Sequence, residues 1–349
     1  MQQKIRVMVV DDSLVFRSWL VQSLSSDPRF DVVGYAVNAL DAKNKLPMLK
    51  PDIMTMDIEM PGMSGLDFLK EVLPSHPVPV ILVSSLNVRV FDALAAGAVD
   101  FVRKPEEGQR EAFLLSLKAK LAMGSSARVR LPQQAPSLSA PAAASLPRTA
   151  FTPSSLPGAG IDLIAIGAST GGTEAILEVV RHFPAKMPGI VITQHMPPGF
   201  TAMYSERLNR ICKLEVKEAQ HGDKVRPGLI LLAPGGLQMR VVRMGVGYSV
   251  SCTNEEKVSG HRPSVDVLFN SVASIAKNRA IGVILTGMGA DGAAGLLRMR
   301  KAGAYTIGQD RDSCVVYGMP MEAHKIGAVC QQASLGNIHQ LVMARLAKA

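Results

Sequence analysis

The sequence predicts a two-domain α/β protein with a parallel sheet in each domain. Three observations predict it: short β-branched apolar runs alternate with amphipathic stretches, glycine-rich turns follow several of those runs, and one central segment shows neither pattern. A chain of 349 residues that is 47% hydrophobic can bury about two separate cores. We therefore expect one α/β domain on each side of the central segment.

The first domain, residues 3–123, is predicted from five strand patterns that alternate with five helical patterns. The strand patterns are 5–12, 30–37, 52–57, 79–85 and 98–104, and the helical ones are 14–24, 39–49, 65–73, 90–97 and 110–122. Such alternation predicts a doubly wound parallel sheet, whose ligands bind beyond the carboxyl ends of the strands.

Acidic residues follow these predicted strands. Asp11 and Asp12 end the first strand and Asp57 ends the third, while Ser84 and Lys104 end the fourth and fifth. Each aspartate alone is more often a cap or turn residue. Together, carboxylates that converge at one edge favour a hard cation such as Mg²⁺, beside which one of them could attack a phosphoryl donor.

The motifs V-V-D-D-S, M-D-I-E-M-P-G-M-S-G, V-S-S and K-P make this half similar to the response-regulator receiver domain. The resemblance implies a flavodoxin-like (βα)5 fold and phosphorylation of Asp57 by a chemotaxis histidine kinase, with Asp11, Asp12 and Asp57 holding Mg²⁺. It also implies that Ser84 and Lys104 contact the phosphoryl oxygens and that Phe101 is the aromatic switch residue. The first domain is therefore expected to be a switch, and the output is expected in the second.

The central segment, residues 124–160, is rich in Pro, Ala and Ser and contains no acidic residue. Such a composition buries too little apolar surface to offset the entropy of ordering, so we expect a flexible linker. The positive net charge of +9 arises from this segment and the second domain. That distribution suits an acidic partner, although a solvated, mildly basic surface is an equally good interpretation.

The second domain, residues 161–349, begins with a strand pattern followed by G-A-S-T-G, residues 167–171. Three interpretations compete for Ser169. It is the cap of the following helix, predicted over 173–183, or part of an anion site at the start of that helix, or the nucleophile of a G-x-S-x-G elbow.

A nucleophilic serine needs a base and an orienting acid. His195 follows the strand pattern GIVITQ, and Asp291 lies in a glycine-rich turn after the strand pattern IGVILTG. A histidine at a strand end is usually solvated or a cap, and Asp291 could cap the helix that follows it. Both nevertheless belong at the same sheet edge as Ser169, where a Ser-His-Asp triad can form.

The chain order Ser, His, Asp differs from that of α/β-hydrolases. Five motifs in order, G-A-S-T-G-G, Q-H-M-P-P-G-F, A-P-G-G, H-R-P-S-V-D-V-L-F and I-L-T-G-M-G-A-D-G, instead resemble the chemotaxis protein-glutamate methylesterase (CheB) family. That family joins a receiver to a doubly wound parallel-sheet α/β serine esterase domain with a β-hairpin.

The resemblance implies phosphorylation-activated hydrolysis of glutamate γ-methyl esters on the cytoplasmic domains of chemoreceptors, with deamidation of certain receptor glutamines. Ser169 is then the nucleophile, His195 the base and Asp291 the orienting acid, while backbone groups near Thr170 and Met288 stabilise the oxyanion. No cofactor is expected for the hydrolysis, and Mg²⁺ belongs to the receiver alone. The unphosphorylated receiver is expected to cover the catalytic edge.

Two features depart from the family pattern. Gln238 stands where the family often has a histidine after A-P-G, which would affect substrate preference if that position shapes the cleft. The linker is also unusually long, which raises the question of how tightly the receiver docks.

Other classes of protein fit less well. A DNA-binding output calls for a basic recognition helix, whereas residues 161–349 alternate strands and helices. A non-catalytic binding module on a degenerate esterase fold is the more serious alternative. Scattered cysteines, the absence of a signal-peptide pattern and the absence of about 18 consecutive apolar residues lead us to expect a cytoplasmic protein that is not integral to a membrane.

Overall fold

The computed structural model describes residues 3–85, 89–129 and 160–348. Most of the predicted flexible linker, over 124–160, therefore lies outside the described residues. Among those residues, no helix has the length and apolar character needed to cross a membrane.

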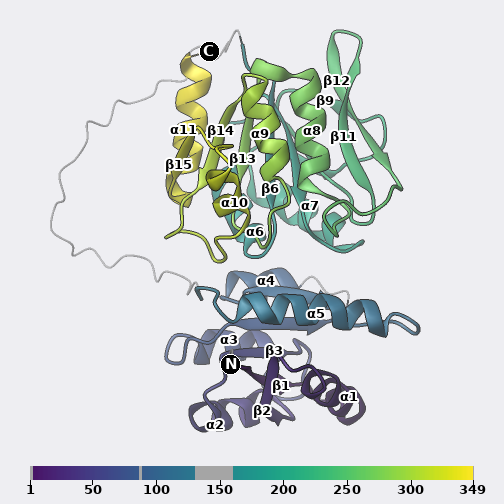
Figure 1. Cartoon of the computed structure of the whole chain (residues 1–349), viewed down its shortest axis with the longest axis vertical. Helices are drawn as coiled ribbons and strands as arrows, with labels where there is room; N and C mark the ends of the chain where they lie inside the picture. The colour runs from purple at the N-terminus through teal and green to yellow at the C-terminus, as the bar shows by residue number, and fades with distance from the viewer. Residues whose placement is uncertain (1–2, 86–88, 130–159, 349) are drawn as a thin grey trace, which may run out of the picture.

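The N-terminal domain is built on a five-stranded parallel sheet in the order β2-β1-β3-β4-β5 (Figure 1). Its elements, in chain order, are β1 (Ile5–Val10), α1 (Leu14–Ser25), β2 (Phe30–Ala36), α2 (Ala39–Leu49), β3 (Ile53–Met56), α3 (Gly65–Val72), β4 (Val80–Ser84), α4 (Arg89–Ala95), β5 (Asp100–Arg103) and α5 (Arg110–Gly124). All five predicted strands and helices are confirmed, including the strand order of a flavodoxin-like sheet.

The sheet of this domain is covered on both faces. Side chains of α1 and α5 pack on one face, and those of α2, α3 and α4 pack on the other. Strands β3 and β4 are consequently buried at every position, which is why their sequences are continuous apolar runs rather than alternating ones. Because both faces of the sheet are covered by apolar side chains, polar side chains can gather at the carboxyl ends of the strands.

The C-terminal domain contains a seven-stranded parallel sheet in the order β15-β14-β13-β6-β7-β10-β8 and a separate three-stranded antiparallel sheet, β11-β12-β9. The strands are β6 (Leu163–Ala168), β7 (Gly189–Gln194), β8 (Glu215–Glu218), β9 (Lys224–Val225), β10 (Leu229–Leu232), β11 (Gln238–Met244), β12 (Gly247–Thr253), β13 (Ala280–Ile284), β14 (Tyr305–Gln309) and β15 (Gln331–Ala333). The predicted doubly wound sheet and its β-hairpin, β11 with β12, are both present.

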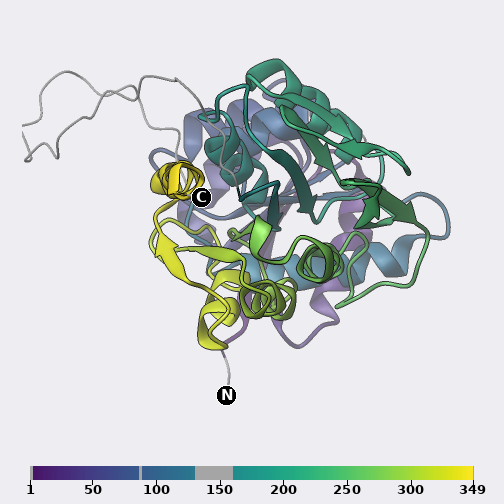
Figure 2. The ribbon, with the colours of Figure 1, turned by 90° about the horizontal axis from the view of Figure 1, so that it is seen from above.

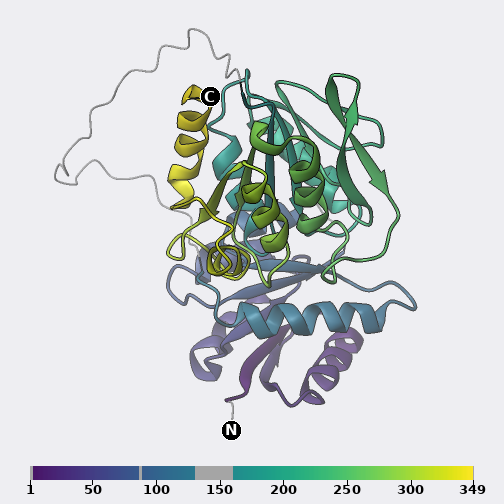
Figure 3. The ribbon, with the colours of Figure 1, turned by 45° about the horizontal axis from the view of Figure 1, so that its top comes forward.

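Helices cover both faces of the seven-stranded sheet. They are α6 (Gly172–Val180), α7 (Phe200–Ile211), α8 (Val265–Ile275), the 3₁₀ turn η1 (Lys277–Arg279), α9 (Ala293–Lys301), α10 (Met319–Lys325) and α11 (Leu335–Lys348). Apolar side chains of α6, α7 and α11 share one core, and those of α8, α9 and α10 share the other. Figure 3 shows α8 and α9 side by side, and Figure 2 shows α11 and the hairpin on opposite sides of the domain.

One predicted helix is too long. The pattern over 173–183 extends past the observed end of α6 at Val180. Phe183 precedes Pro184, and a residue before proline is disfavoured in the helical region, so the helix ends and the chain continues in a turn.

The two domains pack against each other through α4 and α5, which face the second domain in Figure 1, and through β5, which carries Phe101. Phe91 of α4 stacks on Tyr204 of α7 with ring centroids 5.4 Å apart. Phe101 of β5 lies 4.6 Å from Phe200, centroid to centroid. The long linker is therefore compatible with a packed contact between the domains.

Candidate active site and phosphorylation site

Ser169 lies immediately after β6, at the carboxyl edge of the seven-stranded sheet. Its N–H donates to Thr286 O at 3.0 Å, and its carbonyl accepts from the N–H of Gly172 at 2.7 Å. The N-cap of α6 is Gly171, which makes no side-chain capping bond. The interpretation of Ser169 as a helix cap is therefore wrong.

The turn that carries Ser169 is held by two close contacts. Gln194 donates from Nε2 to the carbonyl of Ser169 at 2.8 Å. A Cβ added at Gly287 would lie 2.8 Å from Ser169 Cβ and 3.0 Å from its nitrogen, so only glycine allows the loop after β13 to approach this closely. The glycine-rich turn therefore positions the serine by backbone contact.

His195 follows β7, the strand next to β6, and it is joined to Asp291, which follows β13 on the other side of β6. The distance from His195 Nε2 to Asp291 Oδ2 is 2.7 Å. The side chains of the two residues are 7% and 1% exposed. The three residues that the sequence singled out thus lie at the ends of three adjacent strands.

Asp291 does not cap the helix that follows it, because the N-cap of α9 is Gly292. Its carboxylate instead accepts hydrogen bonds from the start of α8: from Ser264 Oγ at 2.8 Å, from the N–H of Val265 at 2.7 Å and from the N–H of Asp266 at 3.1 Å. Burial acts to raise the pKa of Asp291, but the hydrogen bonds from His195, Ser264 and Val265 outweigh it and leave that pKa below its ordinary value. Asp291 is thereby kept ionised.

Ser264 was missed by the sequence reasoning. It is the N-cap of α8, and its hydroxyl also donates to the carboxylate of Asp291. Its capping role could have been found from the serine that precedes the apolar run V-D-V-L-F. Its contact with Asp291, 27 residues away in the chain, has no sequence signal.

The opposite nitrogen of the imidazole is free to accept a proton. His195 Nδ1 is buried and has no hydrogen-bond partner among the described residues. Because Nε2 faces an ionised carboxylate, a neutral His195 carries its proton there and leaves Nδ1 as an acceptor. Ser169 makes no hydrogen bond to that nitrogen in this structure. The bond between a serine and its base is often long or absent in catalytic sites without substrate.

Gln238 lies in the interior of the second domain. It is completely buried, and its side chain bonds to the N–H of Ser264 and to the carbonyls of Glu256 and His261. An effect of this position on substrate preference, expected if it shapes the cleft, stays a prediction. The amide instead supports the segment that leads into α8.

The acidic cluster of the first domain forms as predicted at the ends of β1 and β3. Asp11, Asp12 and Asp57 each offer a carboxylate oxygen, and these oxygens lie within 4.8 Å of one another. Lys104 Nζ lies 2.5 Å from Asp57 and 2.9 Å from Asp11. Burial raises the pKa of Asp11, whereas for Lys104 burial is outweighed by the two carboxylates, so that its pKa is raised as well.

This cluster has the chemistry of a Mg²⁺ site. Its three carboxylates are hard oxygen ligands, and Asp12 is exposed to solvent. Ser84 Oγ, at the end of β4, is buried without a hydrogen-bond partner among the described residues. An oxygen-rich group bound at Asp57 would supply that missing partner.

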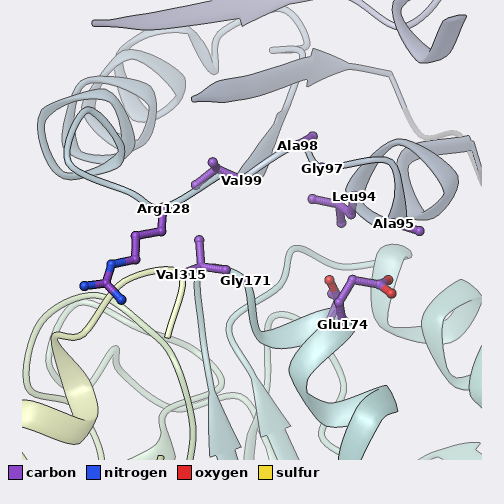
Figure 4. A pocket seen from close by; sticks show the side chains of 10 residues that line it. Leu94, Ala95, Gly97, Ala98, Val99, Arg128, Gly171, Glu174 and Val315 are labelled. Atoms are coloured by element: carbon purple, nitrogen blue, oxygen red, sulfur yellow. The ribbon is translucent and has the colours of Figure 1, made fainter. Parts of the chain in front are cut away.

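The first domain contacts the turn that carries Ser169. Thr170, next to Ser169, donates from Oγ1 to Asp100 Oδ2 of β5 at 2.5 Å, and Lys120 Nζ of α5 lies 2.7 Å from the other oxygen of Asp100. Figure 4 shows the adjoining cavity of about 120 Å³, with Val99 and Leu94 on one side and Gly171 and Val315 on the other. The strand that carries Phe101 is thus bonded directly to the turn that carries the serine.

Comparison with known proteins identifies both domains. Residues 164–342 match the model of the CheB methylesterase family, and residues 7–112 match the response regulator receiver domain. This chain belongs to the CheB methylesterase family. The first domain is accordingly a receiver domain, and the second has the fold of the family's catalytic domain.

Relatives within the family match nearly the whole chain. A protein-glutamate methylesterase/protein-glutamine glutaminase 2 from Syntrophomonas wolfei is 50% identical over 341 residues, covering 97% of this chain and 96% of the relative. A protein-glutamate methylesterase/protein-glutamine glutaminase from Escherichia coli (strain UTI89 / UPEC) is 45% identical over 347 residues, with 98% and 97% covered. The crystal structure of the Thermotoga maritima CheB methylesterase catalytic domain is 32% identical with a TM-score of 0.52, and the match covers 54% of this chain and 99% of that one.

Proposed function

We propose that this chain hydrolyses glutamate γ-methyl esters on the cytoplasmic domains of chemoreceptors and that phosphorylation of its receiver activates it. The observation that carries the proposal is the arrangement of Ser169, His195 and Asp291 at one sheet edge, with His195 bonded to Asp291 at 2.7 Å. The relatives named above for methylesterase and glutaminase activity support the same conclusion.

The first chemical step is attack of Ser169 Oγ on the ester carbonyl. His195 Nδ1 takes the serine proton as the new C–O bond forms, while Asp291 holds the Nε2–H and stabilises the imidazolium. The tetrahedral intermediate then collapses, the bond to the methoxy oxygen breaks, and His195 returns the proton so that methanol leaves. An acyl-enzyme on Ser169 remains.

The N–H groups of Thr170 and Met288 are the proposed oxyanion donors. Neither donates to a backbone carbonyl in the described ranges, and the loops that carry them meet at Ser169 and Gly287. Removal of one such donor typically slows catalysis about 10²–10³-fold. Water then attacks the acyl-enzyme with His195 as base, a step that needs no cofactor.

Deamidation follows the same path with a glutamine side chain. The leaving group is then ammonia, which takes its proton from His195. Both substrates present a γ-carbonyl to the same serine and both yield a glutamate. One site therefore suffices for the esterase and the glutaminase reactions.

In the receiver, Asp57 is the proposed phosphoryl acceptor, with a chemotaxis histidine kinase as the donor. Asp11, Asp12 and Asp57 would hold Mg²⁺, which when bound neutralises charge on the transferred group. Ser84 and Lys104 would contact the phosphoryl oxygens. Phe101 would transmit the change, since it lies on β5 beside Asp100 and packs on Phe200.

The receiver is proposed to inhibit the unphosphorylated enzyme by covering its catalytic edge. The Asp100–Thr170 hydrogen bond and the contacts of Phe91 and Phe101 would have to loosen before a receptor helix could reach Ser169. For phosphorylation to relieve this inhibition, the affinity between the two domains need only depend on the state of the receiver.

The test is methanol release from methylated receptor membranes by the full-length chain and by Ser169→Ala, each with and without a small phosphodonor and Mg²⁺. We expect stimulated release by the wild type and a loss of about 10⁴-fold or more in the variant. Asp57→Asn serves as the control for the switch and should retain only unstimulated release.

A receiver-controlled binding module without catalysis is the competing function. A fluorophosphonate that labels Ser169 in the wild type but not in Ser169→Ala supports the esterase. Equal labelling of both, together with no methanol release on any receptor tried, would leave Ser169 as a turn residue.

A further inference from the structure

A second histidine lies against the catalytic one. The rings of His261 and His195 are stacked with centroids 3.6 Å apart and an angle of 9° between their planes. This is a face-to-face contact over the whole ring, and the Ser-His-Asp mechanism by itself gives it no role. His261 belongs to the H-R-P-S segment, which also supplies Ser264 to Asp291.

Hydrogen bonds of its backbone fix the position of His261. Its N–H donates to Val258 O at 2.9 Å, and its carbonyl accepts from the N–H of Val258 at 3.0 Å and from Gln238 Nε2 at 3.1 Å. Gln238 Oε1 accepts from the N–H of Ser264 at 2.8 Å. One buried amide thus fixes both His261, which covers the face of the catalytic imidazole, and Ser264, which fixes the acid at its edge.

The electrostatic surroundings keep His261 neutral. Burial is the main cause that lowers its pKa to about 4, and His195, Lys120 and Lys257 act in the same direction while Asp291 opposes them. Asp266 and Glu322 line the cavity of about 330 Å³ that His261 also borders. A neutral imidazole offers its π face to a cation, whereas a charged one would repel the imidazolium that forms on His195 during catalysis.

We propose that His261 is a positioning residue for His195, which it holds in the plane that directs one nitrogen to Asp291 and the other to Ser169. Its neutral ring also stabilises the imidazolium form of His195 in the transition state. The inference rests on the proposed esterase function, because it assigns a role within that mechanism.

The first test compares His261→Ala and His261→Phe in the full-length chain activated with a phosphodonor. We expect the alanine variant to lose about 10- to 100-fold in kcat, since small errors in the placement of a catalytic group cost that much, while KM changes little. Phenylalanine keeps a neutral ring of similar size, so it should recover most of kcat. A purely structural role would not produce this split between kcat and KM or this rescue.

The matched control is His182→Ala. His182 lies just after α6, and its ring stacks on that of His339 of α11 with centroids 4.4 Å apart. The substitution therefore removes a stacked histidine pair at another place in the same domain. We expect wild-type kcat from this variant. Melting temperatures of all three variants show whether any loss follows from unfolding.

The second test is the pH dependence of kcat. His261→Arg places a cation on the stack at every pH of the assay, which disfavours an imidazolium on His195. We expect kcat to fall and the acid limb of its pH profile to move to lower pH than in the wild type.

The outcomes separate this inference from the proposed function. If the wild type releases no methanol, the esterase proposal fails first. If the wild type is active and His261→Ala matches it in kcat, His261 has no positioning role. If the phenylalanine variant folds but is as slow as the alanine variant, the ring nitrogens rather than the stacked plane are required, and the inference is also overturned.

Discussion

At the scale of single residues, the surroundings of His195 and Asp291 depend on the buried side chain of Gln238. Gln238 has no exposed surface, and its amide satisfies one N–H and two carbonyls of the segment that leads into α8. The loss of such partners from buried polar groups lowers the free energy of unfolding, because water cannot reach those groups to take the partners' place. The residue that differs from the usual family pattern is therefore a structural support in this chain.

We predict that Gln238→Leu lowers the free energy of unfolding of the catalytic domain by about 1–3 kcal/mol, because it leaves buried backbone groups without partners. Denaturant titration followed by circular dichroism measures the change. Gln220→Leu is the control, since Gln220 is exposed and its substitution should change stability by no more than about 0.5 kcal/mol. Equal stability of the two variants would mean that the amide bonds contribute nothing.

At the scale of elements, the start of α8 and the turn after β13 form one unit around Asp291. The first N–H groups of a helix have no partner within the helix and carry partial positive charge. Val265 and Asp266 direct two of them at the carboxylate, and Ser264 adds its hydroxyl. This unit explains why the pKa of Asp291 stays low despite burial.

The sign of this pKa shift predicts an acid-dependent stability. A carboxyl whose folded pKa lies below its ordinary value of 3.8 contributes stability that is present above about pH 4 and is lost as pH falls through the folded pKa. Wild-type stability should therefore fall more steeply between pH 5 and pH 2 than that of Asp291→Asn. Urea titrations across that pH range measure it, and parallel curves would contradict the assignment.

The same variant tests catalysis at this scale. Asp291→Asn keeps the shape of the side chain but removes the charge that orients His195, so we expect kcat to fall about 10⁴-fold. Methanol release measures the loss. The melting temperature, read near neutral pH, shows that the fold survives the change.

At the scale of the whole molecule, the two α/β domains form an interface beside the sheet edge that carries Ser169. The receiver contributes α4, β5 and α5, and the esterase domain contributes α7 and the turn of Ser169 and Thr170. Phe91 and Tyr204 stack there, with the Arg207 guanidinium 5.9 Å from the Phe91 ring centroid. In the inhibition proposed above, this interface is the part of the molecule that would couple the state of the receiver to access at Ser169.

We predict that Phe91→Ala raises methanol release by the unphosphorylated chain about 5-fold or more, because a weaker interface shifts the population toward the open state. Stimulation by a phosphodonor should shrink correspondingly. Tyr35→Ala is the control, since Tyr35 is 50% exposed on β2 and takes no part in the contacts between the domains given above. Unchanged basal release from both variants would argue against inhibition by the receiver.

Pattern along the chain was enough to place the elements and the residues at their ends. Apolar runs such as IDLIAIG and GIVITQ must lie in buried strands, and parallel strands must all end at one edge, so Ser169, His195 and Asp291 could be placed there without coordinates. The same logic found Asp11, Asp12, Asp57, Ser84 and Lys104.

The groups that surround those residues could not be read from the pattern and are known from the folded structure. His261 lies 66 positions after His195, Ser264 bonds to Asp291 across 27 positions, and Thr170 bonds to Asp100 across 70. Periodicity and capping signals act over a few residues, whereas these contacts depend on strand order and on how loops from different strands pack. Local sequence therefore marks the candidate catalytic residues, while the fold decides their hydrogen-bond partners, their burial and which parts of the first domain contact them.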